Sequence, residues 1–287
     1  MSTGATAGLT VAEARRLALA AWDVFAERTD ALDAAALAAT PTRLAGWTVQ
    51  DLTRHTAWGM SMEAEALRLA VVAEPLRHGA RAAGRPTDAL TGEALHLAWH
   101  RSRAELAAGF DTVAAAVGRG LAPVLPMPYG DVPQTVALDT FVMEAAVHTD
   151  DLLAALAGRG AAAPPLDPAV VAPTARFLQH FWSVLGSAGT PVPAGTTVRL
   201  VGDTVAVGGT FDGTAWRALD ADDGGGPSDG GADGSADGGG GASVTLRGDD
   251  STVLRVALGR VPVASAGLQL TGDAGLARAL KEHVPGP

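Results

Sequence analysis

The sequence predicts an α+β protein in which an N-terminal four-helix bundle precedes a small α+β domain. Two sequence patterns, one in each half of the chain, support this prediction. The first half repeats apolar residues at helical spacing in four long segments, and four amphipathic helices joined by moderate loops form a bundle. The second half changes to short runs rich in Val, Thr and Leu, which are typical of strands. A chain of 287 residues can bury the cores of two such domains.

Start and stop signals delimit the first two helices of the bundle. The first covers residues 11–39, with a break expected near residues 29–30, and Pro41 stops it because the residue before proline disfavours the helical conformation. The second begins after Thr48, a favourable N-cap, and runs to about residue 73. Asp51 stands three residues after Thr48, as in a capping box.

The other two helices complete the predicted helical domain, which we assign to residues 1–160. The third spans residues 89–117. The fourth follows Pro133 and runs to about Leu156, with Gly158 as its C-terminal cap.

A fifth helix, residues 168–185, and a proline-containing linker occupy residues 161–194 and lead into the C-terminal domain, residues 195–287. Strands are expected in that domain at residues 197–201, 204–207, 215–219, 243–246 and 253–258, followed by a terminal helix at residues 274–283. A Gly- and Asp-rich segment at about residues 220–242 has no large apolar side chain to offset the entropy of ordering, so we predict a disordered insertion there.

Composition excludes several classes of function. The net charge of −10, from 21 basic and 31 acidic residues, would repel nucleic acid and anionic membrane surfaces. The chain contains no cysteine, so any metal ligand must be His, Asp or Glu, and any reactive thiol must come from another molecule. The N-terminus lacks the pattern of a secretory signal, and no run of apolar residues is long enough to span a membrane. We therefore expect a cytoplasmic protein.

Three residues could form a metal site. Glu144 and His148 are four residues apart on a predicted helix, so they lie on one face and can bind one ion together. His55, on another predicted helix, would complete a set of three ligands. Three protein ligands with an open fourth position are typical of catalytic zinc, although iron(II), nickel and manganese accept similar ligands.

The residues around these ligands resemble the mycothiol-dependent maleylpyruvate isomerase family, whose N-terminal domain is a DinB-like four-helix bundle. Residues 44–55, LAGWTVQDLTRH, are similar to its first signature, and residues 144–152, EAAVHTDDL, are similar to its second. The resemblance is strong to about Gly158 and weak from about Thr196, where the family has a sterol carrier protein-like domain. It implies a divalent metal, most often Zn²⁺, held by His55, Glu144 and His148, with mycothiol as the thiol cosubstrate.

Two aspartates could orient the ligand histidines through the ring nitrogen that does not face the metal. Asp51 precedes His55 by one turn, and Asp151 follows His148 by three residues. The alternatives are a helix cap for Asp51 and a solvated helix face for Asp151. We count Asp151 among the catalytic candidates.

A rival metal site lies on the third predicted helix. Glu93, His96 and His100 have the spacing that bundles use for two-metal centres, but no second Glu-x-x-His accompanies them. We expect His96 and His100, if they face inward, to line the substrate cleft. Trp47 and Trp58 are expected to pack in the core of the bundle, because large aromatic side chains most often do so.

Arg260, which follows the run LRVALG, is expected at the end of a strand, where the family carries a Gly-Arg pair. A guanidinium there could bind a substrate carboxylate through two parallel hydrogen bonds, whereas the alternative is a surface ion pair. We include Arg260 among the catalytic candidates.

The combined reading is a thiol-dependent metalloenzyme acting on a small electrophilic substrate. A metal-bound thiolate would attack the substrate, giving S-conjugation or cis–trans isomerisation of the maleylpyruvate type. The alternatives are a non-catalytic binding or regulatory protein of the same fold and a metal-dependent hydrolase. Either a monomer or a homodimer is compatible with the sequence, and the single lysine amid abundant Ala and Gly suits GC-rich actinobacterial coding.

Overall fold

The computed structural model of the chain describes residues 8–72, 85–127, 130–158, 163–219 and 241–285. These residues form two compact units, and the division falls between Pro173 and Thr174. The predicted Gly- and Asp-rich insertion lies mainly outside the described residues. The architecture is α+β, as predicted, with a helical N-terminal unit and a sheet-containing C-terminal unit.

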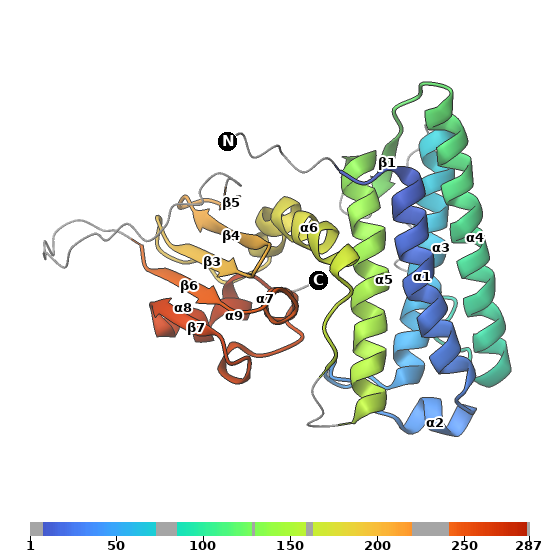
Figure 1. Cartoon of the computed structure of the whole chain (residues 1–287), viewed down its shortest axis with the longest axis horizontal. Coiled ribbons are helices and arrows are strands. Elements are labelled where there is room, and N and C mark those ends of the chain that lie inside the picture. The colour runs from blue at the N-terminus through green and yellow to red at the C-terminus, as the bar shows by residue number, and fades with distance from the viewer. Residues whose placement is uncertain (1–7, 73–84, 128–129, 159–162, 220–240, 286–287) are drawn as a thin grey trace, which may run out of the picture. The chain divides into compact units, whose positions relative to one another are not determined.

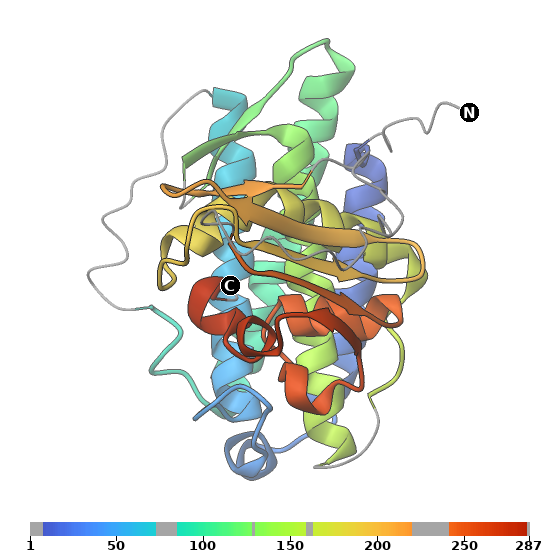
Figure 2. The same ribbon diagram turned by 90° about the vertical axis from the view of Figure 1, so that its left-hand side faces the viewer.

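Four long helices of the N-terminal unit run side by side as a bundle (Figures 1 and 2). They are α1 (Val11–Asp30), α3 (Val49–Val72), α4 (Gly92–Gly118) and α5 (Gln134–Ala157). The expected break after α1 is present, because Asp33 caps a separate short helix, α2 (Ala34–Ala39), by accepting a hydrogen bond from the Ala36 backbone N–H at 2.7 Å.

The N-terminus of α3 has the predicted cap. The Asp51 carboxylate accepts hydrogen bonds from the Thr48 backbone N–H at 3.0 Å and from the Thr48 hydroxyl at 2.7 Å. The Thr48 hydroxyl in turn accepts from the Asp51 backbone N–H at 3.3 Å. This reciprocal box fixes where α3 begins and hence which face of the helix carries its seventh residue, His55.

The core of the bundle is built from aromatic side chains of α1 and α4. Phe25 stacks on Trp99 with ring centroids 5.3 Å apart, and Trp22 meets Trp99 edge-on at 6.0 Å. The Trp99 indole N–H donates to the Thr56 hydroxyl at 2.9 Å, which satisfies a buried polar group. This contact ties α4 to α3 directly beside His55.

Two short antiparallel strands, β1 (Val124–Met127) and β2 (Gly130–Pro133), connect α4 to α5. The sequence analysis did not predict them. Each has four residues and contains a proline, so neither gives the alternation by which strands are recognised.

The C-terminal unit contains a five-stranded sheet in the order β5-β4-β3-β6-β7. Its strands are β3 (Thr197–Val201), β4 (Ala206–Phe211), β5 (Trp216–Ala218), β6 (Ser243–Arg247) and β7 (Gln269–Gly272). Strands β3 and β6 are parallel, whereas the other neighbours are antiparallel. The helices of this part of the chain are α6 (Pro168–Ser187), α7 (Asp250–Ala257), α8 (Ala274–Arg278) and α9 (Leu280–His283), with a 3₁₀ turn, η2 (Val263–Ser265).

The predicted strand at residues 253–258 is wrong, because this run lies almost entirely in α7. Asp249 caps the helix by accepting a hydrogen bond from the Thr252 backbone N–H at 2.9 Å. A short apolar run with Val and Leu does not distinguish a strand from a buried helix by its period, and here the cap decides. Arg260 therefore follows a helix and does not end a strand.

Among the described residues, none of the helices is long and apolar enough to cross a membrane.

Candidate metal centre

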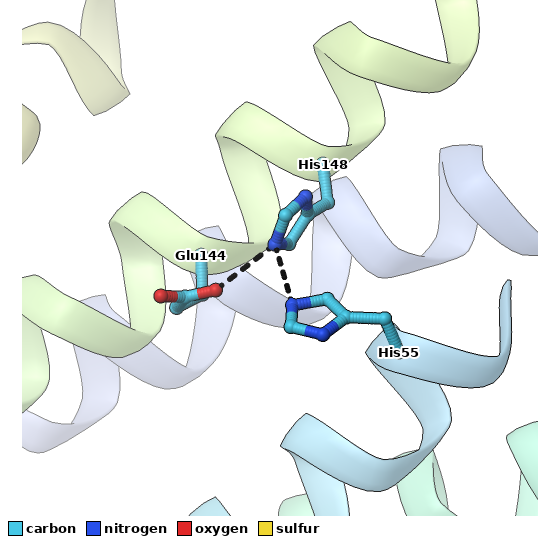
Figure 3. Close-up of side chains that lie close together, drawn as sticks. All are labelled: His55, Glu144 and His148. Atoms are coloured by element: carbon cyan, nitrogen blue, oxygen red, sulfur yellow. Dashed lines mark hydrogen bonds and ion pairs between the residues drawn. The ribbon is translucent and has the colours of Figure 1, made fainter. Parts of the chain in front are cut away.

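The structure brings His55, Glu144 and His148 together between α3 and α5 (Figure 3). The Nε2 atom of His148 lies 3.2 Å from the Nε2 atom of His55 and 3.1 Å from Oε2 of Glu144. One ligand atom from each residue can be chosen so that all three lie within 4.8 Å of one another. Glu144 and His148 share a face of α5 because they are four residues apart.

Asp151 is hydrogen-bonded to Nδ1 of His148, the ring nitrogen that does not face Glu144 and His55. Its side chain is fully buried, and its Oδ2 accepts a hydrogen bond from His148 Nδ1 at 3.1 Å. A proton on Nδ1 leaves the lone pair on Nε2, the atom that faces Glu144 and His55. The solvated face considered as the alternative for Asp151 is therefore wrong.

Two opposing effects act on the pKa of His148. Burial disfavours the charged ring, but hydrogen bonds to Asp151 and Glu144, together with the negative charges of these two carboxylates, outweigh it and raise the pKa. The site therefore favours a positive charge at His148 Nε2, whether that charge is a proton or a metal ion.

Arg43 supports Asp151 from the segment between α2 and α3. Its Nε donates to Asp151 Oδ1 at 2.6 Å, and a terminal nitrogen donates to Asp150 Oδ2 at 2.5 Å. Burial opposes the guanidinium charge, but the two aspartates outweigh it and raise the pKa of Arg43. Sequence reasoning missed Arg43. The available signal was the adjacent acidic pair Asp150-Asp151 just before the apolar run at residues 152–156, because buried acids need a cation nearby.

His55 is bordered by aromatic rings and an arginine. The rings of Trp47 and Trp58 have centroids 5.1 Å and 6.5 Å from that of His55. Both tryptophans are only partly buried, so the prediction that they pack in the core is wrong. A terminal nitrogen of Arg85 lies 3.2 Å from His55 Nδ1, and its guanidinium lies 5.2 Å from the centroid of Trp58.

Glu63 is a second residue that sequence reasoning left without a role. Its carboxyl group is buried, and its Oε2 has no hydrogen-bond partner among the described residues. Burial, and then the negative charge of Glu144, raise the pKa of Glu63 well above its usual value. Glu63 lies eight residues after His55 on α3, about two helical turns along.

Asp51 does not hold His55, since its carboxylate is engaged by Thr48 and by Arg54, whose terminal nitrogen lies 3.2 Å away. The helix-cap alternative holds for Asp51.

The rival histidines lie elsewhere in the bundle. His96 Nδ1 and His100 Nε2 each lie 3.0 Å from the carboxylate of Asp30 on α1. Glu93 is exposed and does not join them as a ligand. In the described part of the chain, His55, Glu144 and His148 are the group of His, Asp and Glu side chains placed to hold an ion.

Arg260 belongs to the C-terminal unit and is considered within it. Its terminal nitrogen donates to the Leu258 carbonyl at 2.8 Å. Lys281 donates to the neighbouring Ala257 carbonyl at 2.5 Å, so two cations converge on the C-terminal end of α7. Burial, and then the positive charge of Arg260, lower the pKa of Lys281 to about 7. The role of Arg260 toward a substrate stays a prediction.

The donor set fits a zinc-type ion. Two imidazole nitrogens and one carboxylate oxygen are ligands that Zn²⁺ accepts, and three protein ligands leave a position for another molecule. His55 and Glu144 are partly exposed, whereas His148 is buried.

Comparisons with known proteins identify a domain family and a similar fold. Residues 18–153 match the model of the mycothiol maleylpyruvate isomerase N-terminal domain. Two crystal structures, of the mycothiol-dependent maleylpyruvate isomerase and of a histidine-to-alanine mutant of it, match with TM-scores of 0.62 and identities of 19% and 17%. Each comparison covers 92% of this chain and 93% of the other. No curated relative matches the sequence significantly. Residues 18–153, which include His55, Glu144 and His148, therefore form a domain of the mycothiol maleylpyruvate isomerase N-terminal family.

Proposed function

We propose that this protein is a mycothiol-dependent metalloenzyme that acts on a small electrophilic substrate, by S-conjugation or by cis–trans isomerisation of the maleylpyruvate type. The convergence of His55, Glu144 and His148 inside the matched domain is the observation that carries the proposal. The similar solved structures, which are of a mycothiol-dependent maleylpyruvate isomerase, support the choice of thiol and reaction class.

Each residue of the centre has a part in this proposal. His55, Glu144 and His148 hold a divalent ion, of which zinc fits the donors best. Asp151, itself held by Arg43, fixes the ring and tautomer of His148. When bound, the ion would hold the sulfur of mycothiol and favour its ionised form, because coordination lowers the pKa of a thiol. The absence of cysteine from the chain fits a thiol supplied by a cosubstrate.

The covalent chemistry then takes place between thiol and substrate. The sulfur lone pair forms a bond to an electrophilic alkene carbon, and the alkene electron pair moves onto the adjoining carbonyl group. Rotation about the resulting single bond and loss of the same sulfur give the isomer and return the thiol. Protonation of the adduct instead gives the conjugate. Within this proposal, Arg260 binds a substrate carboxylate.

Cobalt substitution tests the proposal. Cobalt(II) bound to the wild-type protein should develop a sulfur-to-metal charge-transfer band when mycothiol is added, and the zinc protein should convert maleylpyruvate only in the presence of mycothiol. The His148→Ala variant should lose stoichiometric metal, whereas His96→Ala, a histidine of the same bundle paired with Asp30, should retain it. Normal cobalt binding with no response to thiol would contradict the thiol-dependent chemistry and favour a binding protein or a hydrolase.

A further inference from the structure

Arg85 is held next to the metal centre by a turn that is fixed to α3. The Thr87 hydroxyl donates to the Arg54 carbonyl at 2.9 Å, and the Leu90 carbonyl accepts from Arg54 Nε at 2.9 Å. Arg54 immediately precedes His55 in the sequence. The turn that carries Arg85 is thus anchored on the same helical turn as a metal-binding histidine.

The charge of Arg85 is not balanced by a carboxylate. Arg43 and Arg54, the other arginines near the centre, lie within 3.2 Å of aspartate oxygens. In the part of the chain that the structure describes, no such ion pair is formed by Arg85, whose guanidinium instead lies over Trp58 and beside His55 Nδ1. A cation over an aromatic face keeps its N–H groups at the edge available for an anion.

The ring chemistry of His55 reinforces this point. If the Nε2 lone pair of His55 faces the ion, the proton of the neutral ring is on Nδ1. A guanidinium has donors and no acceptor, so Arg85 cannot hydrogen-bond to a protonated Nδ1. With the ion in place, the donors of Arg85 that point toward His55 are therefore available to a ligand of the centre.

We propose that Arg85 is a specificity-determining residue that binds a carboxylate of the molecule reacting at the metal centre. The proposal rests on the proposed function, and it assigns the anion site to a residue of the N-terminal unit other than Arg260. The guanidinium offers paired N–H groups that match the two oxygens of a carboxylate. Mycothiol has no carboxylate, since its cysteine carboxyl is part of an amide, so within the proposed function the carboxylate belongs to the electrophilic substrate; the second measurement below tests the alternative, a different thiol that carries a carboxylate.

The first measurement is the affinity of maleate, a simple dicarboxylate, for the zinc-loaded protein by isothermal titration calorimetry. Arg85→Gln should weaken binding at least tenfold, because a charge-assisted bidentate contact is lost. Arg85→Lys should retain part of the affinity. The control is Arg101→Gln, which removes the same charge from an exposed position on α4 and should change the affinity less than twofold. Equal affinities for wild type and Arg85→Gln, or loss of zinc from Arg85→Gln, would overturn the proposal.

The second measurement uses the cobalt protein and compares 3-mercaptopropionate with the uncharged 2-mercaptoethanol. If the thiol carries the carboxylate, wild type should bind mercaptopropionate more tightly, and Arg85→Gln should abolish the preference. If the substrate carries it, only maleate binding should depend on Arg85. A wild-type protein that neither binds maleate nor prefers the charged thiol would contradict the proposal. If Arg85→Gln weakens maleate binding but no thiol produces a cobalt–sulfur band, the anion site is supported and the thiol chemistry is refuted.

Discussion

Replacing Asp151 by Asn tests how the centre is held without altering a ligand. Asp151 is fully buried, and its two oxygens accept from His148 Nδ1 at 3.1 Å and from Arg43 Nε at 2.6 Å. Asn has the same shape but carries no charge, and only one of its two terminal atoms can accept a hydrogen bond. One of the two donors therefore loses its partner.

The expected loss can be worked from these contacts. Residues that orient a ligand histidine contribute about 10- to 100-fold to metal affinity. This range corresponds to about 1.4–2.7 kcal/mol, since a factor of ten is about 1.4 kcal/mol. Loss of the negative charge also removes one of the effects that raise the pKa of His148 and favour a cation at Nε2. We therefore expect zinc affinity to fall by one to two orders of magnitude.

The assay is competition for zinc with a chromophoric chelator at neutral pH. The matched control is Asp150→Asn, because Asp150 also binds Arg43, at 2.5 Å, whereas the carboxylate that accepts from His148 Nδ1 is that of Asp151. Both variants weaken the anchoring of Arg43, but Asp151→Asn also alters the group that accepts the hydrogen bond from His148 Nδ1. Equal zinc affinities for the two variants would refute the assigned role of Asp151 in orienting His148.

Three further predictions concern other sites. Because the pKa of Glu63 is raised in the folded protein, the stability that its protonated form contributes is fully present below the ordinary glutamate pKa and is lost as pH rises through the raised value. Between pH 5 and pH 8, the unfolding free energy of Glu63→Gln, measured in urea, should therefore fall less than that of wild type. Equal decreases in the two proteins would contradict this. Lys281, the single lysine, should titrate near pH 7 by NMR after ¹³C reductive methylation, and a midpoint near that of a free lysine would contradict the burial of its ammonium group. Thr48→Ala should cost about 1 kcal/mol of unfolding free energy through loss of the helix cap, measured by thermal melting against Thr112→Ala, an exposed threonine within α4, which should cost less.

The helices of the bundle and the shared face of Glu144 and His148 could be predicted because their signals are local. Helical spacing, the break near Asp30 and the Thr48 cap can each be recognised from neighbouring residues in the sequence, and the structure confirms them. Glu144 and His148 share a face through their spacing alone. His55 joined them only through the resemblance of its flanking residues to a known signature.

The remaining parts of the centre depend on contacts between distant segments. Arg43 meets Asp151 across 108 residues, and Arg85 reaches His55 from a turn 30 residues away. No periodic pattern marks either arginine, because irregular loops carry no repeat. The tryptophans beside His55 were misassigned for the same reason: their size indicates burial but not what they border.

The 93 residues that separate His55 from His148 have a consequence for folding kinetics. An ion held by both histidines cross-links two helices and closes a long loop, whose entropic cost is about 4 kcal/mol from the logarithmic dependence on length. Neither helix can hold all three ligands alone, so the full site forms only after the bundle has closed around it. Such a late cross-link slows unfolding and leaves the folding rate nearly unchanged. Resistance to unfolding would then depend on the supply of metal after synthesis.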